Sequence, residues 1–425
     1  YAVQLGASPS EMGWFRSVSN LFGNIMQVPW GMVSDKLKKR VPFIILGGIL
    51  SSLLWLPMIH VRTPEELIGF VALQAFVSSM VAPVWSALIG DMVPQSGRGS
   101  VTASINASAS LGSIVATLIS GYIMMSVGGT LSQMYMIPLI LTALCGFGAS
   151  LTMLTLSEQR KFEVQSWTNW RYIFKSNPNF RFFCLISVFH SFFMSMAWPI
   201  FPITLVRIVK ADMLQIGYLS AMSGAVSLVV RRFAGRLTDR AGRKPLVVAG
   251  RAGIVIVPTI YAIATSIYHL LIVDFFTGFL VAASEIAVFA YLLDVTPEEQ
   301  RAASFALFNT VNGLSTFVGS LAGGYLASMM SLLGFDELAS LQFVYGISAV
   351  GRLSAGLLFM KIREPYRYPS TVREELTQIM LEDREYAKKI LEEIEERGQI
   401  TEEELEKDLE WFESTLRWRK DREGR

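Results

Sequence analysis

The strongest chemical signal in this sequence is an acidic residue inside an apolar segment. Glu285 lies near the middle of such a run, where a charged side chain costs about 2.5–3.5 kcal/mol to insert into a bilayer. Asp274 precedes it by eleven residues, which places both carboxylates on one face of a helix, about 16 Å apart along its axis. Glu285 could carry a coupling proton or bind a cationic solute. The alternative is a structural pair with a basic side chain.

A second group of polar and aromatic residues lies in two other apolar runs. The imidazole of His190 changes charge near neutral pH and could relay protons or bind a ligand. A lone histidine in such a run more often packs in a hydrogen-bonded state, and that alternative stays open. Trp198, Pro199 and Pro202 indicate a hinged, aromatic wall at one end of a helix, and Gln74 is the candidate for the opposite wall.

Amide side chains recur with helical spacing near the start of the chain. Asn20, Asn24 and Gln27 fall on one side of a helix, because these offsets span a narrow arc at 3.6 residues per turn. Polar side chains are costly in lipid, so this stripe must face protein or a wet cavity. Stripes of small and polar residues also begin at Asn106 and Asn309. Tight helix packing would explain their serines and glycines equally well.

The elements that must position these residues are membrane-spanning helices. The chain is 52% hydrophobic and only 17% charged, and a helix needs about 20 apolar residues to cross a bilayer. These values predict an all-α polytopic membrane protein and exclude a soluble enzyme, a disordered chain and a β-barrel. The 59-residue stretch 99–157 has no charge and suffices for two helices joined at Gly128-Gly129. Eleven candidate helices result, within 11–33, 41–61, 67–90, 99–157 (two), 182–206, 213–230, 252–273, 269–293, 302–335 and 338–360.

Two motifs recur with nearly the same shift along the chain. The segment Gly-Met-Val-Ser-Asp-Lys-Leu-Lys-Lys-Arg at 31–40 resembles Gly-Arg-Leu-Thr-Asp-Arg-Ala-Gly-Arg-Lys at 235–244, a shift of 204 residues. The segment Asp-Met-Val-Pro at 91–94, with Arg98, recurs as Asp-Val-Thr-Pro at 294–297, with Arg301, a shift of 203. Two motifs in one register indicate a parallel duplication of a six-helix half.

On these motifs the chain resembles the major facilitator superfamily of transporters, over about residues 1–362. The resemblance implies twelve helices in two parallel, pseudo-repeated six-helix halves. The counterpart of the helix at about 178–208 would precede residue 1, so we expect the eleven helices to be helices 2–12 of the family, without the first. The family places helices 2, 5, 8 and 11 where the two halves slide past each other.

The resemblance also implies a cytoplasmic gate built from the repeated motifs. Asp35 is expected to face the start of helix 11 near Arg301, and Asp239 the start of helix 5 near Arg98, where helix dipoles favour carboxylates. The alternative is that these charges only orient the loops. The candidate gate residues are Gly31, Asp35, Arg40, Asp91, Arg98, Gly235, Asp239, Arg243, Asp294 and Arg301.

Charge distribution predicts the orientation and a separate tail. Lys and Arg concentrate in alternate loops, so the positive-inside rule places those loops and the C-terminus in the cytoplasm of a protein of the cell membrane. From Arg363 onward acidic residues outnumber basic ones by 19 to 13, and two capped amphipathic helices predict a cytoplasmic helical hairpin. The expected parts are an N-terminal transmembrane half (1–157), a central cytoplasmic loop (158–177), a C-terminal transmembrane half (178–362) and the charged tail (363–425).

These features predict a secondary active transporter that moves a small solute by alternating access, with proton coupling as one option. The solute and the lipid bilayer are its expected partners, the tail could bind a cytoplasmic protein, and nucleic acid is not expected. The alternative is a non-transporting receptor or scaffold on the same fold. No enzymatic activity, cofactor or metal is expected, and Cys145 and Cys184 suit neither a disulfide framework nor a metal site.

Overall fold

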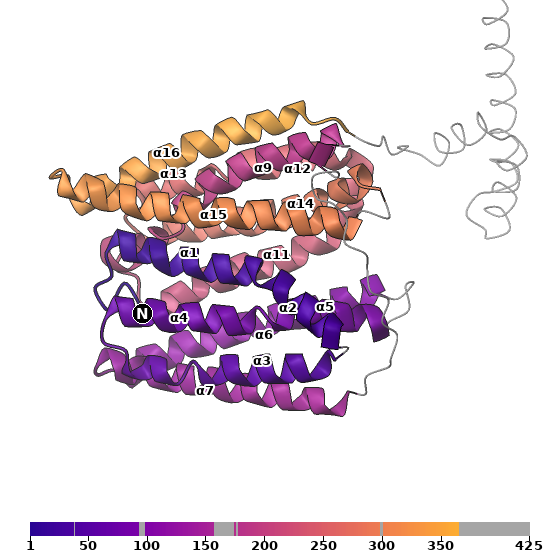
Figure 1. Ribbon diagram of the computed structural model, residues 1–425. Coiled ribbons are helices and arrows are strands. Elements are labelled where there is room, and N and C mark those ends of the chain that lie inside the picture. The colour runs from indigo at the N-terminus through magenta and orange to yellow at the C-terminus, as the bar shows by residue number, and fades with distance from the viewer. Residues whose placement is uncertain (38, 93–97, 157–173, 176, 298–300, 365–425) are drawn as a thin grey trace, which may run out of the picture. The chain divides into compact units, whose positions relative to one another are not determined.

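The computed structural model describes residues 1–37, 39–92, 98–156, 174–175, 177–297 and 301–364, and every regular element in these residues is a helix (Figure 1). One compact unit comprises Tyr1–Gly235 and Arg243–Pro365. The short segment Arg236–Gly242 does not belong to this unit. The helical hairpin predicted for the tail lies outside the described residues.

The helices of the first part of the chain are α1 (Pro9–Ile25), α2 (Gln27–Leu37), α3 (Val41–Leu53), α4 (Pro64–Ser78), α5 (Val81–Met92), α6 (Arg98–Val127) and α7 (Leu131–Thr152), with short 3₁₀ turns at Pro57–His60 and Met153–Thr155. After the central loop follow α9 (Pro178–Met196), α10 (Phe201–Ile203), the π-helical turn η3 (Thr204–Ile208), α11 (Met213–Ala241), α12 (Arg243–Gly253), α13 (Ile256–Ile263), α14 (Ile267–Val295), α15 (Arg301–Leu332), α16 (Glu337–Leu358) and a 3₁₀ turn at Phe359–Lys361.

Within the described residues, nine helical segments are long and apolar enough to cross a membrane. Two further helical segments are long enough to cross a membrane but have a more polar sequence. One is α1 followed by α2, and the other is α15. Together with the nine, they give the predicted number of helices, but the helix predicted over 252–273 is wrong in its bounds, because that segment spans Arg243–Ile263 and the next helix begins at Ile267. These two more polar segments pack against each other through α1 and α15 (Figure 1). They therefore need fewer apolar residues than a helix surrounded by lipid.

Local sequence explains where the helices begin and break. Ser8 caps α1 because its hydroxyl oxygen accepts a hydrogen bond from the Glu11 backbone N–H. The Glu11 carboxylate in turn accepts one from the Ser8 backbone N–H, which completes a capping box. The turn predicted at Gly128-Gly129 is confirmed, since both glycines have positive φ. The single helix predicted over 11–33 is wrong in one respect, because it breaks at Met26 into α1 and α2.

The exposed surface of the helices is strongly apolar. On α6 the exposed side chains of Leu111, Val115 and Ile119 repeat every four residues, whereas Ser110 and Thr117 lie on the opposite face of the helix. A soluble protein rarely exposes such a continuous apolar stripe. One face of α6 is therefore suited to lipid and the other to a polar environment inside the bundle.

Candidate functional site

An ion pair joins α11 to α14 inside the bundle. The Arg231 Nη2 lies 2.6 Å from the Glu285 Oε2, and the two side chains are 46% and 54% exposed. Arg231 also donates from Nε to the Ser227 hydroxyl at 3.3 Å. Glu285 thus has the basic partner that one sequence interpretation expected, and the pair remains accessible from a cavity.

A polar pocket of about 450 Å³ lies between α6 and α11 beside this ion pair. Its α6 wall carries hydroxyl groups whose hydrogens point into the helix itself: Ser110 donates to the Asn106 carbonyl at 2.8 Å, and Thr117 donates to the Ser113 carbonyl at 2.7 Å. The oxygen lone pairs of these hydroxyls stay available to accept hydrogen bonds. The lining residues are Asn106, Ala109, Ser110, Ser113, Ile114, Thr117, Ser220, Gly224 and Arg231.

At one end of this pocket the backbones of α6 and α11 come into close contact. A Cβ added at Gly121 would lie 2.9 Å from the Met213 carbonyl oxygen, so only glycine permits this approach. Arg207, just before α11, ties the same end together. Its Nη1 pairs with the Glu337 Oε1 at 2.7 Å, and its Nη2 donates to the Ala7 carbonyl at 2.7 Å. We call this the closed end.

The helices α1 and α15 also meet over most of their length, beginning at the closed end. The Ser17 hydroxyl donates to the Phe317 carbonyl at 2.8 Å, and the Ser10 backbone N–H donates to the Ser328 hydroxyl at 3.0 Å. Between these bonds, a Cβ built on Gly13 would lie 3.3 Å from the Gly324 Cα. The small residues of these stripes therefore bring two backbones together, as tight packing requires.

The amide stripe predicted from the sequence is divided between α1 and α2. Asn20 and Asn24 donate their amide N–H to the carbonyls of Arg16 and Asn20, four residues earlier, and Gln27 donates likewise to Gly23. All three amides, like Gln74 on α4, are partly exposed. Asn24 also packs against Gly313 of α15, so it lies at the α1–α15 contact.

The remaining interior candidates lie away from the polar pocket. His190 on α9 is fully buried; its Nε2–H donates to the Arg251 carbonyl at 3.1 Å and its Nδ1 accepts from Arg251 Nη1 at 3.4 Å. Both ring nitrogens are thus engaged, as in the packing alternative. Asp274 on α14 and Trp198, between α9 and α10, are partly buried. None of these three residues lines the pocket between α6 and α11.

Two of the gate residues pair directly with each other. Arg243 at the start of α12 binds Asp294 near the end of α14, with Nε and Oδ2 3.1 Å apart. The Glu364 carboxylate accepts hydrogen bonds from the backbone N–H groups of Arg243 and Lys244 at 3.1 and 2.7 Å. Arg40 is buried before α3, Arg301 begins α15, and Gly31 lies in α2. Gly235 lies in α11, and the side chains of Asp35, Asp91, Arg98 and Asp239 lie outside the described part of the structure.

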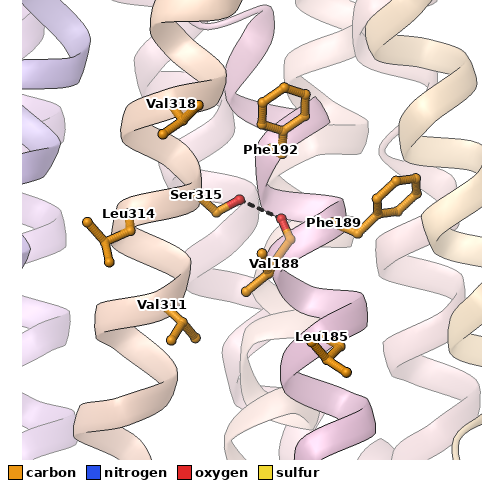
Figure 2. A pocket seen from close by; sticks show the side chains of 8 residues that line it. All are labelled: Leu185, Val188, Phe189, Phe192, Val311, Leu314, Ser315 and Val318. Carbon is orange, nitrogen blue, oxygen red and sulfur yellow. Dashed lines mark hydrogen bonds between the residues drawn. The ribbon is translucent and has the colours of Figure 1, made fainter.

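A larger pocket of about 620 Å³ lies between α9 and α15 (Figure 2). Its walls are Leu185, Val188, Phe189, Phe192, Val311, Leu314, Ser315 and Val318. Its single hydroxyl, on Ser315, is already bonded to the Val188 carbonyl (Figure 2). This apolar groove offers nothing to orient a polar solute, whereas the pocket between α6 and α11 does.

The sequence did not single out two residues that organise these contacts. Arg231 directly follows the apolar run 213–230, and its position at the end of that run was the available signal. Its partner Glu285 lies 54 residues further along the chain. Whether the two side chains meet depends on how α11 and α14 are rotated about their axes. Arg207 lies in the short stretch between the apolar runs 182–206 and 213–230, where a single basic residue is not distinctive.

The chain matches the model of the Major Facilitator Superfamily over residues 1–193 and 183–400, and it belongs to this family. It is 25% identical over 371 residues to the uncharacterized MFS-type transporter MJ1560 of Methanocaldococcus jannaschii, covering 83% of this chain and 92% of that protein. It is 26% identical over 153 residues to the class H tetracycline resistance protein of Pasteurella multocida, covering 36% and 38%.

Solved transporters share its fold. The inward-facing, unoccupied structure of a bacterial homolog of the human lysosomal transporter Spinster has a TM-score of 0.66 at 15% identity, covering 85% of this chain and 92% of that one. The nucleoside transporter NupG has a TM-score of 0.67 at 14% identity, covering 85% of this chain and 92% of that one. The predicted fold is thus confirmed, and the chain is a multi-pass membrane protein of a transporter family rather than of an enzyme family.

Proposed function

We propose that this protein is a secondary active transporter that moves a small polar solute by alternating access. The proposal rests on a difference between the two ends of the α6–α11 interface, one of which is closed and the other open to a polar pocket. These helices touch at Gly121 and Met213, and a polar pocket lies between them further along. A solute in that pocket is separated from one side of the membrane by the closed end. Separation of the closed end would expose it to that side.

The charge distribution supports an orientation in the cell membrane. The basic loop residues cluster at the ends of α2, α6 and α15 that lie away from the closed end, and the positive-inside rule assigns them to the cytoplasm. The described state is then inward-facing, with the closed end outside. The similarity to an inward-facing Spinster homolog agrees with this assignment at the level of the fold.

The two transmembrane halves, divided at the central loop 158–177, would move against each other in this cycle. Contacts between α1 and α15 and between α6 and α11 would separate at the outer end. The repeated motifs with Asp35 and Asp239 would then latch the cytoplasmic end near Arg301 and Arg98. The ion pair between Arg243 and Asp294 would support this latch by holding the start of α12 against the end of α14.

Glu285 is the proposed coupling residue. Its carboxylate pairs with Arg231 and is about half exposed, so solvent can deliver a proton to it, and protonation would break the ion pair. Breaking that pair frees α11 to move relative to α14. A proton taken up here would therefore bias the conformational equilibrium, which is the requirement for coupling.

The test uses uptake together with a reversible lock on the closed end. A thermal-shift screen of small polar solutes on purified protein selects a ligand, and its uptake is measured in proteoliposomes. Ser10→Cys and Ser328→Cys, introduced after replacing Cys145 and Cys184 by serine, place a cysteine pair where Ser10 N–H meets the Ser328 hydroxyl. Oxidation should stop uptake and reduction should restore it.

Each single cysteine variant is the matched control and should transport under both conditions. Uptake that continues in the oxidised double variant contradicts alternating access at this end. A protein that moves no solute in the screen contradicts transport and favours the receptor alternative.

A further inference from the structure

Resting on the transport function above, we propose that the solute is a small hydroxylated carboxylate, which replaces Glu285 on Arg231 when Glu285 takes up a proton. The pocket between α6 and α11 is its binding site. Arg231 is the residue that selects the negative charge, and the α6 hydroxyl wall selects the hydroxyl groups. The apolar groove between α9 and α15 takes no part.

The α6 wall favours a solute that donates hydrogen bonds. Ser110 and Thr117 have already given their hydroxyl hydrogens to backbone carbonyls, so toward the pocket they accept. The Asn106 amide adds an acceptor at the far end of the same wall. A chain of solute hydroxyls satisfies these acceptors, whereas an apolar solute leaves them without partners, which costs binding free energy.

The opposite wall favours a negative charge. Among the described residues that line the pocket, only Arg231 is charged. Its guanidinium is half-exposed and uses Nη2 for Glu285 and Nε for Ser227, and no bond from Nη1 occurs within the described residues. Guanidinium groups bind carboxylates through two parallel hydrogen bonds, so an incoming carboxylate competes directly with Glu285.

A cationic solute fits the same geometry poorly. Glu285 could attract such a cation, but its carboxylate is already paired with Arg231. Arg251 of α12 lies near enough to Glu285 to interact with it electrostatically. A cation would therefore have to displace one arginine while lying near a second, which like-charge repulsion opposes.

The groups around Glu285 make it the proton acceptor of this exchange. Arg231 faces it from α11 and Arg251 from α12. The other helices packed on α14 contribute His190 from α9, which bonds to Arg251, and Tyr261 from α13, which interacts with Asp274. When Arg231 turns to the solute, Glu285 loses its hydrogen-bonded partner and gains a second carboxylate as a neighbour. Uptake of one proton from solution by Glu285 then keeps the site neutral.

Charge is conserved through this exchange. Before it, Arg231 is balanced by the Glu285 carboxylate; afterwards, Arg231 is balanced by the solute carboxylate and Glu285 is neutral. One proton thus accompanies one monovalent anion, and their combined charge is zero. Transport should therefore respond to a pH gradient and not to membrane potential.

Three probes that share one polyol chain test the charge selection. Gluconate ends in a carboxylate, sorbitol is neutral and N-methylglucamine is a cation. In proteoliposomes with an acidic exterior, gluconate uptake should exceed that of protein-free vesicles at least tenfold, and a potassium–valinomycin potential should not change it. Uptake of sorbitol or N-methylglucamine in preference to gluconate overturns the carboxylate proposal and leaves the transport function standing. If none of the three moves, the carboxylate proposal falls, and the cysteine-lock experiment alone decides on transport.

Variants separate selection from coupling. Arg231→Gln should lower gluconate uptake at least tenfold. Glu285→Gln should keep gluconate binding and exchange, but lose the acceleration by the pH gradient and the pH dependence of binding. Arg232→Gln is the matched control, since Arg232 is the exposed neighbour of Arg231, and its uptake should match the parent. Gradient-driven uptake by Glu285→Gln, or undiminished uptake by Arg231→Gln, overturns the proposal. Should Arg231→Gln fail to fold, the Glu285→Gln result decides.

Discussion

The Arg207 guanidinium donates to the Ala7 carbonyl oxygen at 2.7 Å while it pairs with Glu337. One side chain thereby joins the segment before α1 to the start of α16, two parts of the chain more than 300 residues apart. In the proposed cycle, opening of the closed end would separate these two parts of the chain and break both bonds. Arg207 would then stabilise the closed arrangement of this end relative to the open one.

Replacing Arg207 by glutamine should shift the protein toward a state open at that end. A charge-assisted hydrogen bond is worth about 1.5–3 kcal/mol, and partial exposure lowers this to about 1–2 kcal/mol, or about 5- to 30-fold in the ratio of states. Spin labels at positions 10 and 328 would report the change as a larger share of long distances. Lys210→Gln, an exposed change two residues after η3, should leave the distances unchanged. An identical distribution in both variants would show that Arg207 does not hold the closed end.

A second prediction concerns the backbone contact between α1 and α15. A Cβ at Gly324 would lie 2.5 Å from the Pro9 carbonyl and 2.9 Å from the Gly13 Cα, and neither atom can move aside without its helix. Gly324→Ala should cost about 1–3 kcal/mol of stability in this state, as overpacking does. Thermal unfolding in detergent measures the loss. Gly346→Ala, where an added Cβ meets nothing within 4 Å, should be neutral or slightly stabilising. Equal effects at both glycines would argue against close packing here.

Arg352 is a buried charged residue that donates hydrogen bonds to backbone carbonyls inside the bundle. It is buried on α16, and its two Nη groups donate to the carbonyls of Ile254 and Met194 at 3.2 and 2.8 Å. Ile254 lies in the break between α12 and α13, and Met194 lies near the end of α9. Such breaks leave carbonyls that the helix itself does not satisfy.

Arg352→Met should therefore destabilise the protein by about 2–5 kcal/mol, because two buried carbonyls lose their donors. The free energy of unfolding in mild detergent is the measurement. Arg363→Met, at an exposed position after the last turn, is the control and should change stability little. A loss no greater than that of the control would mean that water satisfies these carbonyls.

The sequence predicted the crossings well because hydrophobic length and the Gly128-Gly129 turn are local properties. It also singled out Glu285 as a carboxylate within an apolar run, and its role in coupling stays a prediction. It did not identify Arg231 as the partner, because the pairing depends on how α11 and α14 are rotated and placed. His190 illustrates the same limit. Its type suggested chemistry, but its bonds to Arg251 were visible only once α9 and α12 were packed together.

The break at Met26 was missed for a related reason. Asn20, Asn24 and Gln27 keep helical spacing across it, and each amide bonds to a carbonyl four residues earlier. Polar side chains that bond back to their own helix commonly accompany local bending. The amide side chains therefore keep helical spacing across Met26, although the helix itself is interrupted there.

The last prediction tests the pair between Arg243 and Asp294, which closes the start of α12 onto the end of α14. Arg243 is almost fully buried and Asp294 is partly exposed, with 3.1 Å between their atoms. Asp294→Asn should cost about 1–3 kcal/mol, less than the roughly 3–5 kcal/mol of a fully buried pair, because solvent reaches Asp294. A double-mutant cycle with Arg243→Gln isolates the interaction from the backbone bonds to Glu364, which both variants retain. We expect the double variant to be more stable than the sum of the single losses implies. Additive losses would show that the two charges contribute independently, and the pair would then have no part in holding α12 against α14.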